Sequence, residues 1–263
     1  MKRILLYSGI LLVTYGLSVN YVTAQAPSIS YSPQTNVFTK GTAITTLTPT
    51  TAGGAVPATT YSTVSTLAGT TTSLNNPRGL ATDGSGNIYE ADFTGNIINK
   101  ISSTGTVTLA SGSGTAGEKN GNKNSSKYDG PWGIVYDGSA NLYVCDNTGN
   151  AIRKVVAANG TSTTLAGPTN GTPGETDGTG GSATFTGPMG IAYDGTNNYL
   201  YVCDNGGNKI RRIAISTGAV LTIAGSGTGS ESDSPTGTSA TFNGPAGIVY
   251  DGAGNLYVSD AVG

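Results

Sequence analysis

The stretch PWGIVYDGSANLYVCD, from Pro131 to Asp146, decides the fold because the chain repeats its pattern four times. The other copies start at Pro77, Pro188 and Pro245, so the intervals between successive prolines are 54, 57 and 57 residues. The third copy carries one inserted residue. A fixed period of this size is typical of stacked copies of one supersecondary unit, none of which buries its apolar face alone.

Each copy predicts four short strands. In the second copy, an apolar run over residues 133–137 leads into a hairpin turn, and Leu142–Asp146 returns as the second strand. The turn residues tolerate positive φ. A third strand is expected at Ile152–Val155 and a fourth at Thr161–Ala166, before a long polar loop that opens at Gly167.

Four-stranded units of this period predict the blades of an all-β propeller. The second strand is apolar on both faces, since Leu142 and Val144 alternate with Tyr143 and Cys145, and it must be covered on both sides. A β-sandwich, the competing all-β fold, has a turn every 8–12 residues or so and needs no self-similarity over longer distances. The repeats therefore favour the propeller.

The third copy and its extension resemble an NHL repeat. They read GPMGIAYD up to Asp194 and LYVCDNGGNKIRRI from Leu200 to Ile213, and the other copies match them closely, over about residues 64–263. The resemblance implies β-propeller blades in rings of about six. It also implies a role as a protein-interaction scaffold, an extracellular sensor or an RNA-binding platform, although related six-bladed rings include lactonases and a lyase.

Counting strands predicts about three and a half blades. Val64–Ala68 reads as a lone fourth strand, three blades follow, and the last copy reaches Gly263 before its third strand. One ring cannot close with that number, so we expect either a fragment of a longer protein or an open arc that pairs with a second copy. The lone strand favours the fragment, because rings often close by completing the last blade with an N-terminal strand.

The first residues predict an export signal. The basic pair Lys2-Arg3 precedes the apolar run Ile4–Val13, and Val22-Thr-Ala24 offers the small residues that a signal peptidase reads. We therefore expect residues 1–24 to be a cleaved signal peptide and the protein to be secreted or displayed at the cell surface. The alternative, a transmembrane anchor, is disfavoured because polar residues interrupt a run that is already short for a bilayer.

Residues 25–62 differ in composition from the repeats. They are rich in Thr, Pro and Gly with scattered apolar residues. They resemble the start of an Ig-like domain of the kind that leads secreted bacterial proteins, but are too few for a whole sandwich. We expect a spacer over 25–62, followed by the repeat segment 63–263.

The charge balance argues against a nucleic-acid partner. Without Lys2 and Arg3, 11 of the 13 basic residues remain against 15 acidic ones, a net charge of −4. A phosphate-binding surface instead needs clustered Lys and Arg. We interpret the basic residues of the third strands as a solvated face; they are Lys100, Arg153, Lys154, Lys209, Arg211 and Arg212.

The chain has no histidine. This removes Ser-His-Asp and Cys-His catalysis and the usual zinc ligand sets, including the histidine-based zinc site of the lyase relatives. We expect no catalytic residue, no metal and no cofactor. The open alternative is a calcium-dependent lactonase or hydrolase, whose site would use Glu, Asp and Asn oxygens.

Two sets of aspartates recur in the copies. The first set precedes Gly in the hairpin turns and is expected to accept hydrogen bonds from backbone amides two residues on; its members are Asp83, Asp137, Asp194 and Asp251. The second set ends the second strands and is expected to stabilise the next turn; its members are Asp92, Asp146, Asp204 and Asp260.

The two cysteines, Cys145 and Cys203, occupy the same slot in successive copies. Equivalent positions in neighbouring units usually lie too far apart for the short Cα separation of a disulfide. We expect both to be unpaired small residues that pack within a strand.

Slots in which the copies differ are the candidates for binding. The slot between Pro and Gly begins the innermost strand of a propeller blade, near the mouth of the channel. Glu90 replaces the Val of the other copies, and Phe93 stands where two copies have Asn. The predicted binding residues are Arg78, Glu90, Phe93, Trp132 and Met189. Trp132 is the expected anchor, because Trp is enriched at binding hot spots.

The sequence thus predicts an exported, non-enzymatic scaffold that binds a protein or a glycan through its inter-blade loops. Two alternatives stay open: the lactonase-like enzyme and a purely structural cell-surface spacer. The expected partners are an unidentified protein or glycan ligand and the missing blades, supplied by a longer chain or a second copy. Neither nucleic acid nor stable membrane insertion after signal cleavage is expected.

Overall fold

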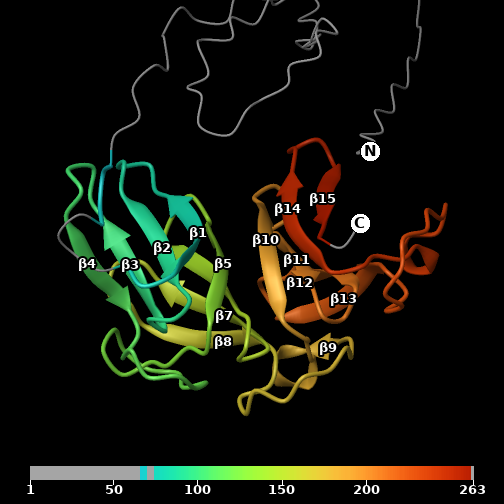
Figure 1. The fold of residues 1–263 in the computed structure, drawn as a ribbon, viewed down its shortest axis with the longest axis horizontal. Helices are drawn as coiled ribbons and strands as arrows, with labels where there is room; N and C mark the ends of the chain where they lie inside the picture. The colour runs from blue at the N-terminus through green and yellow to red at the C-terminus, as the bar shows by residue number, and fades with distance from the viewer. Residues whose placement is uncertain (1–65, 70–73, 262–263) are drawn as a thin grey trace, which may run out of the picture. The chain divides into compact units, whose positions relative to one another are not determined.

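The four copies of the repeat fold into four successive antiparallel sheets, which we number blades 1 to 4 (Figure 1). The computed structural model describes residues 66–69 and 74–261. The predicted signal peptide 1–24 and leader 25–62 lie outside the described residues. The all-β propeller fold with about three and a half blades is confirmed, and the described blades do not close a ring.

The first three blades each contain four strands that pair in chain order. Blade 1 contains β1 (Pro77–Thr82), β2 (Ile88–Asp92), β3 (Ile97–Ile101) and β4 (Val107–Ser111). Blade 2 contains β5 (Pro131–Tyr136), β6 (Asn141–Asp146), β7 (Ala151–Val156) and β8 (Ser162–Ala166). Blade 3 contains β10 (Pro188–Asp194), β11 (Tyr199–Asp204), β12 (Lys209–Ala214) and β13 (Ala219–Ala224). The described part of blade 4 contains β14 (Pro245–Tyr250) and β15 (Leu256–Asp260).

The loops between the blades contain little regular structure. The loop before blade 3 contributes β9 (Gly178–Thr179), which pairs with β13 at the outer edge of that blade, and a 3-10 turn at Gly180–Ser182. A second 3-10 turn lies at Gly237–Ser239. The expected lone strand at Val64–Ala68 is not seen in its described part, because residues 66–69 form no strand.

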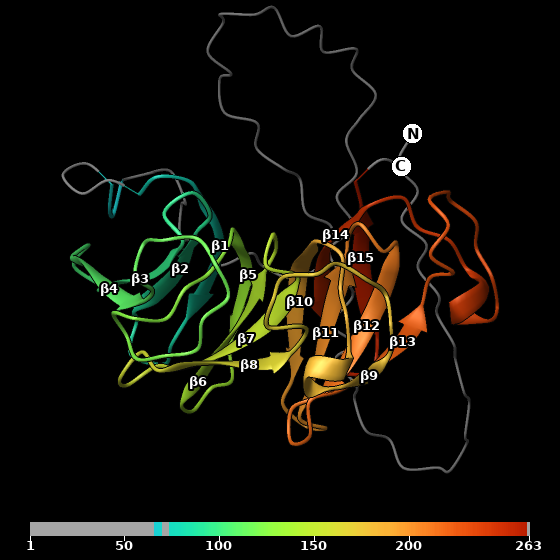
Figure 2. The same ribbon diagram turned by 90° about the horizontal axis from the view of Figure 1, so that it is seen from below.

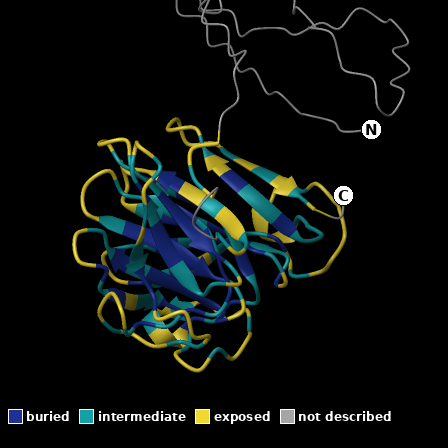
Figure 3. Ribbon diagram, turned by 60° about the vertical axis from the view of Figure 1, so that its left-hand side comes forward, coloured by how far each residue is buried: buried dark blue, intermediate teal, exposed yellow. Residues whose placement is uncertain are grey.

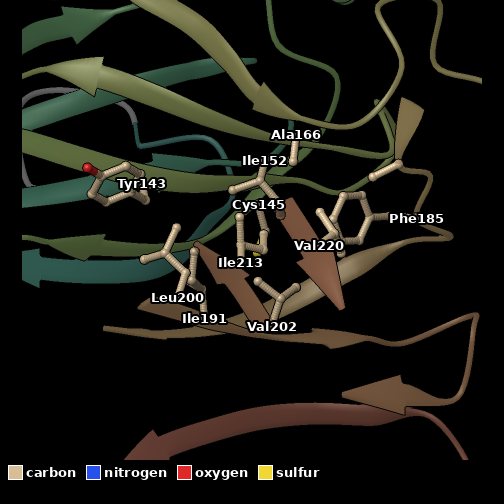
Figure 4. Packing of buried hydrophobic residues seen from close by; sticks show 11 residues of the cluster. Tyr143, Cys145, Ile152, Ala166, Phe185, Ile191, Leu200, Val202, Ile213 and Val220 are labelled. Atoms are coloured by element: carbon tan, nitrogen blue, oxygen red, sulfur yellow. The ribbon is translucent and has the colours of Figure 1, made fainter. Parts of the chain in front are cut away.

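The second strands of blades 2 and 3 are covered on both faces, as their sequence predicts, whereas β15 of blade 4 leaves Tyr257 exposed. Tyr143 and Cys145 of β6 belong to a buried cluster with Leu200 and Val202 of blade 3, which Figure 4 shows from close by. The opposite face of β6 packs against blade 1. Neighbouring blades therefore share their cores. The buried residues lie mainly on the strands, whereas the turns are exposed (Figure 3).

The hairpin between the first two strands of each blade is held by its aspartate. In blade 2, Asp137 Oδ1 accepts from the Ser139 amide at 2.9 Å, and its Oδ2 accepts from Asn141 Nδ2 at 2.6 Å. The corresponding amide bonds to Asp83, Asp194 and Asp251 are also present. The predicted role of this set is confirmed.

The inner strands, which are β1, β5, β10 and β14, pack beside one another and join the blades (Figure 2). A glycine on each inner strand makes this close approach possible. A Cβ added at Gly133 would lie 2.1 Å from the carbonyl oxygen of Met189, and one at Gly190 would lie 2.5 Å from that of Ala246. Real Cβ atoms do not come so close to backbone, so the spacing of the blades requires glycine here.

We predict that Gly133→Ala separates blades 2 and 3 and lowers the free energy of unfolding by about 1–3 kcal/mol or more, the usual cost of overpacking. Urea unfolding followed by Trp132 fluorescence measures it. The control is Gly84→Ala, because nothing lies within 4 Å of a Cβ at that position. Equal unfolding midpoints for the two variants would contradict the close-approach argument.

Candidate functional site

Three of the five predicted binding residues lie together where blades 1 and 2 meet. The Cζ atom of Arg78 lies 4.2 Å from the centroid of the Trp132 ring and 5.4 Å from that of the Phe93 ring. The two rings meet edge to face, with centroids 5.4 Å apart and an interplanar angle of 84°. Arg78 is exposed, and both aromatic residues are half-buried. We call Arg78, Phe93 and Trp132 the mouth cluster.

The mouth cluster lies at the proline end of the blades, where each inner strand begins and each second strand ends. Antiparallel pairing places Pro77 of β1 opposite Asp92 of β2, so Phe93 follows directly beside the start of β1. The Phe93 amide donates to the carbonyl oxygen of Asn76 at 3.0 Å, which holds its backbone there. Strands β1 and β5 are neighbours, so Arg78 and Trp132 occupy the same slot on adjacent inner strands.

Phe93 occupies the position of an asparagine in two other copies, and this change allows its ring to contact Trp132. In blades 2 and 3 the equivalent residues are asparagines, and each donates to the carbonyl of the next inner-strand proline: Asn147 to Pro188 and Asn205 to Pro245, both at 3.2 Å. Phe93 cannot make this bond. Its ring instead packs against Trp132 and lies over Gly130, where an added Cβ would come within 2.7 Å of the ring.

The other two predicted residues stand outside the mouth cluster. Met189 begins the next inner strand, β10, where it occupies the same slot as Trp132 and is half-buried. Glu90 lies on β2, where alternation directs its side chain away from blade 2, because Tyr89 and Ala91 face blade 2. Glu90 therefore does not share a surface with the aromatic pair.

Glu90 is a fully buried carboxyl group. Its Oε2 atom accepts from Asn99 Nδ2 at 2.9 Å, whereas Oε1 has no hydrogen-bond partner among the described residues. It lines a cavity of about 270 Å³ whose other walls are mostly apolar, with Leu80, Ile88 and Ile101 among them. Burial raises the pKa of Glu90 to about 7; the Asn99 bond lowers it in part, and the charge of Asp92 raises it further.

Two arginines of the third strands are buried, which corrects the predicted solvated face. Arg211 Nη1 donates to Asp204 Oδ2 at 2.7 Å and to the Thr184 carbonyl at 3.0 Å, and neither charged side chain is exposed. Its Nη2 donates to the Thr176 carbonyl at 3.0 Å and to Asp177 Oδ1 at 2.9 Å. The arginine thus ties the loop before blade 3 to the blade itself.

Arg153 does the same in blade 2. It pairs with Asp146 Oδ2 at 3.1 Å and donates to the carbonyls of Lys127 and Lys119, both at 3.0 Å. Each arginine also lies over a buried aromatic ring from the loop before its blade, Arg153 over Tyr128 and Arg211 over Phe185. The other predicted basic residues are not buried; these are Lys100, Lys154, Lys209 and Arg212.

The two buried arginines recur at the same slot of successive copies, which is the signal that the sequence carried. Arg153 stands opposite Val144 in the strand pairing, and Arg211 stands opposite Val202. Residues that face each other across a ladder share one side of the sheet. Both arginines therefore share the side of a buried valine, whereas Lys154 and Arg212 point to the other side. Facing a buried residue does not by itself bury the partner, because Tyr143, opposite Lys154, is buried as well.

The aspartates that end the second strands hold the chain segment before the inner strand, rather than mainly the next turn. Asp146 Oδ1 accepts from the Asp129 amide and Asp204 Oδ1 from the Thr186 amide, both at 2.7 Å. Asp92 accepts from the Asn75 and Asn76 amides and also from Gly95 in the next turn. The predicted contact with the next turn is thus confirmed for Asp92. The prediction did not include the hydrogen bonds to the segment before the inner strand, which Asp92, Asp146 and Asp204 all accept.

The described part of the chain also places the two cysteines and the other side chains of the types that bind metals. Cys145 and Cys203 are both buried and unpaired, as expected. Within residues 66–69 and 74–261, no group of three or more His, Cys, Asp or Glu side chains is placed to hold a metal ion. The same residues contain no helix long and apolar enough to cross a membrane.

Comparison with known proteins agrees with the repeat pattern. The chain is 33% identical over 138 residues to NHL repeat-containing protein 2 of Bos taurus, and 34% identical over 125 residues to the Homo sapiens protein of the same name. The matches cover 50% and 45% of this chain, but only 18% and 17% of those proteins. No family model matches. The homologues support an NHL-repeat family.

Solved structures resemble this chain in fold. A protein of unknown function from Bacteroides thetaiotaomicron matches with a TM-score of 0.57 and 25% identity, over 72% of this chain and 46% of that one. An auxiliary nutrient binding protein from the same species matches with a TM-score of 0.57 and 21% identity, over 72% of this chain and 47% of that one. The chain therefore spans less than half of each of these structures.

We predict a pH-dependent stability that arises from Glu90. Its folded-state pKa of about 7 lies above the ordinary value of 4.5, so the folded protein favours the protonated carboxyl. That stabilisation is complete below about pH 4.5 and is lost as the pH rises through 7. Glu90→Gln is uncharged at every pH, so its Tm should fall less than that of the wild type between about pH 5 and pH 8.

Thermal unfolding across that range measures the difference between the two proteins. The matched control is Glu231→Gln, which removes an exposed glutamate from the loop before blade 4. A pH profile of Glu90→Gln that runs parallel to the wild-type profile would contradict the assignment.

We predict that Arg211→Met destabilises the protein by about 3–5 kcal/mol, because Asp204 would stay buried without its cation. Burial already raises the pKa of Asp204 to about 6, and the Thr186 amide and Arg211 are the groups that oppose this rise. Urea unfolding at neutral pH measures the loss. Arg212→Met, on the other side of the same strand, is the control and should cost less than about 1 kcal/mol. Similar losses for both variants would refute the buried pair's role.

Proposed function

We propose that this protein is an exported, non-enzymatic NHL-repeat scaffold that binds a protein or glycan ligand at the proline end of its blades. The observation that supports this proposal most directly is the mouth cluster. Three slots in which the copies differ, at Arg78, Phe93 and Trp132, pack together and leave a cation and two aromatic rings at least partly accessible. Aromatic residues and arginine are the side chains enriched at binding hot spots.

The positions that are the same in every copy serve the scaffold, which leaves binding to the positions that differ. The hairpin aspartates accept hydrogen bonds from backbone amides. The aspartates that end the second strands also accept from backbone amides, and in blades 2 and 3 they pair with arginines as well. Carboxylates engaged in this way serve the scaffold and are not free to act as bases or nucleophiles. The chain also has no histidine, the residue that most often acts as a general acid or base, and this supports a binding role.

The proposal includes a location outside the cytoplasm and further blades beside blade 4. The Lys2–Ala24 segment supports a secreted or cell-surface location. Val249 and Tyr257 of blade 4 are 63% and 55% exposed, whereas their counterparts Val135 and Tyr143 in blade 2 pack against the core shared with blade 3. We expect further blades, from a longer chain or a second copy, to cover these two side chains.

We predict that Trp132→Ala weakens ligand binding by about 30-fold or more, the effect of losing a hot-spot side chain worth about 2 kcal/mol. The wild type is first screened on arrays of neutral and acidic oligosaccharides and of peptides, and the affinity for each hit is then measured by calorimetry. The control is Tyr199→Ala, which removes a half-buried aromatic ring that also lies under an arginine, Arg212, but outside the mouth cluster.

Retention of wild-type affinity by Trp132→Ala would overturn the proposed surface. Binding to no array member, or turnover of a bound sugar or peptide, would overturn the proposed function itself. Loss of binding in both variants would assign the effect to general destabilisation and count against the mouth cluster.

A further inference from the structure

We infer that the mouth cluster recognises a sugar ring that carries a carboxylate, so that the ligand is a glycan containing uronic acid. This inference rests on the proposed binding function and names the ligand class.

Arg78 is the cation of the mouth cluster, and nothing in the described chain neutralises it. Its guanidinium lies over the Trp132 ring with Cζ 4.2 Å from the centroid, and within 5.4 Å of Phe93. Among the described residues it forms no ion pair with an acid. Arg153 and Arg211, in contrast, are each paired with a buried aspartate.

Within the described residues the Arg78 side chain donates no hydrogen bond and forms no ion pair, so its N–H groups are available to a ligand. These donors form a fork that matches the two oxygens of a carboxylate. Contact with the Trp132 and Phe93 rings also limits the rotation of a side chain that is otherwise flexible, so less conformational entropy is lost when the fork binds an anion. The structure therefore presents an oriented, unpaired carboxylate receptor at the surface.

The apolar side chains beside the fork set the size of the ligand. Phe93 and Trp132 lie within 5.4 Å of each other, and Met189 begins the next inner strand. Because the cation and both rings lie within 5.4 Å of one another, a ligand that carries a carboxylate and a compact apolar face in one small unit contacts all three at once. A pyranose ring with a carboxylate on its ring carbon combines these two features, because its C–H groups form an apolar face that packs against aromatic rings. The carboxylate of an acidic peptide is attached to a flexible chain without such a face.

The test compares polymers that differ in one feature. Polygalacturonate carries the carboxylate on a sugar ring, its fully methyl-esterified form keeps the sugar and removes the charge, and poly-L-glutamate keeps the charge and removes the sugar. Retardation in affinity gels and calorimetry at fixed salt measure binding of the wild type, Arg78→Gln and Arg78→Lys. Arg212→Gln is the matched control, since Arg212 also lies over an aromatic ring, Tyr199, with Cζ 4.6 Å from its centroid.

The wild type should bind polygalacturonate at least tenfold or so more tightly than either other polymer, the worth of one charge-assisted hydrogen-bonded pair. Arg78→Gln should bring polygalacturonate and its ester to similar affinities. Arg78→Lys should keep only part of the preference because it lacks the fork. Arg212→Gln should leave the preference unchanged.

Three results would overturn the inference while the proposed function stands: equal wild-type binding of the ester, tighter binding of poly-L-glutamate, or an unchanged preference in Arg78→Gln. Each would leave the loss of array hits in Trp132→Ala intact. Failure of the wild type to bind any of the three polymers would overturn the ligand class, and failure on the arrays as well would overturn the binding function. The two failures are thus distinguishable.

Discussion

The close approach of the inner strands is the constraint on which the rest of this structure depends. Each inner strand carries a glycine, and at Gly79, Gly133 and Gly190 the carbonyl of the next inner strand occupies the space where a Cβ would stand. Adjacent blades can therefore share cores such as the one around Tyr143 and Val202. The same spacing brings the slot before each glycine beside its counterpart, so Arg78 and Trp132 meet although they are distant in the sequence.

A second set of interactions holds the loops against this frame. The aspartate at the end of each second strand accepts hydrogen bonds from the backbone just before the inner strand. In blades 2 and 3 a buried arginine extends this contact to the long inter-blade loop. Blade 1 departs from the pattern, with Asn99 in the arginine slot and Glu90 in the valine slot. The residues that distinguish blade 1 thus include Arg78 and Phe93 of the mouth cluster and the buried carboxyl of Glu90.

Much of the fold was predictable from the repeat, and the misses have physical causes. Strand periodicity, hairpin aspartates and the two-faced burial of β6 follow from local patterns, and the structure confirms them. The burial of Arg153 and Arg211 did not follow from alternation, because both faces of the second strand are apolar and Lys154 also faces a buried residue, Tyr143. The inner strand β5 begins at Pro131, two residues before the predicted run, because a proline can open a strand without donating to the ladder.

The sequence by itself determined the repeating unit, its four strands and the slots in which the copies differ, because these depend on alternation and turn chemistry within one blade. Only the tertiary structure decided which of those slots share a surface. Arg78, Phe93 and Trp132 come from three strand ends and meet through packing between blades, while Glu90, two residues before Asp92, points away from them. Such contacts depend on the distance between neighbouring backbones, which no single copy of the repeat encodes.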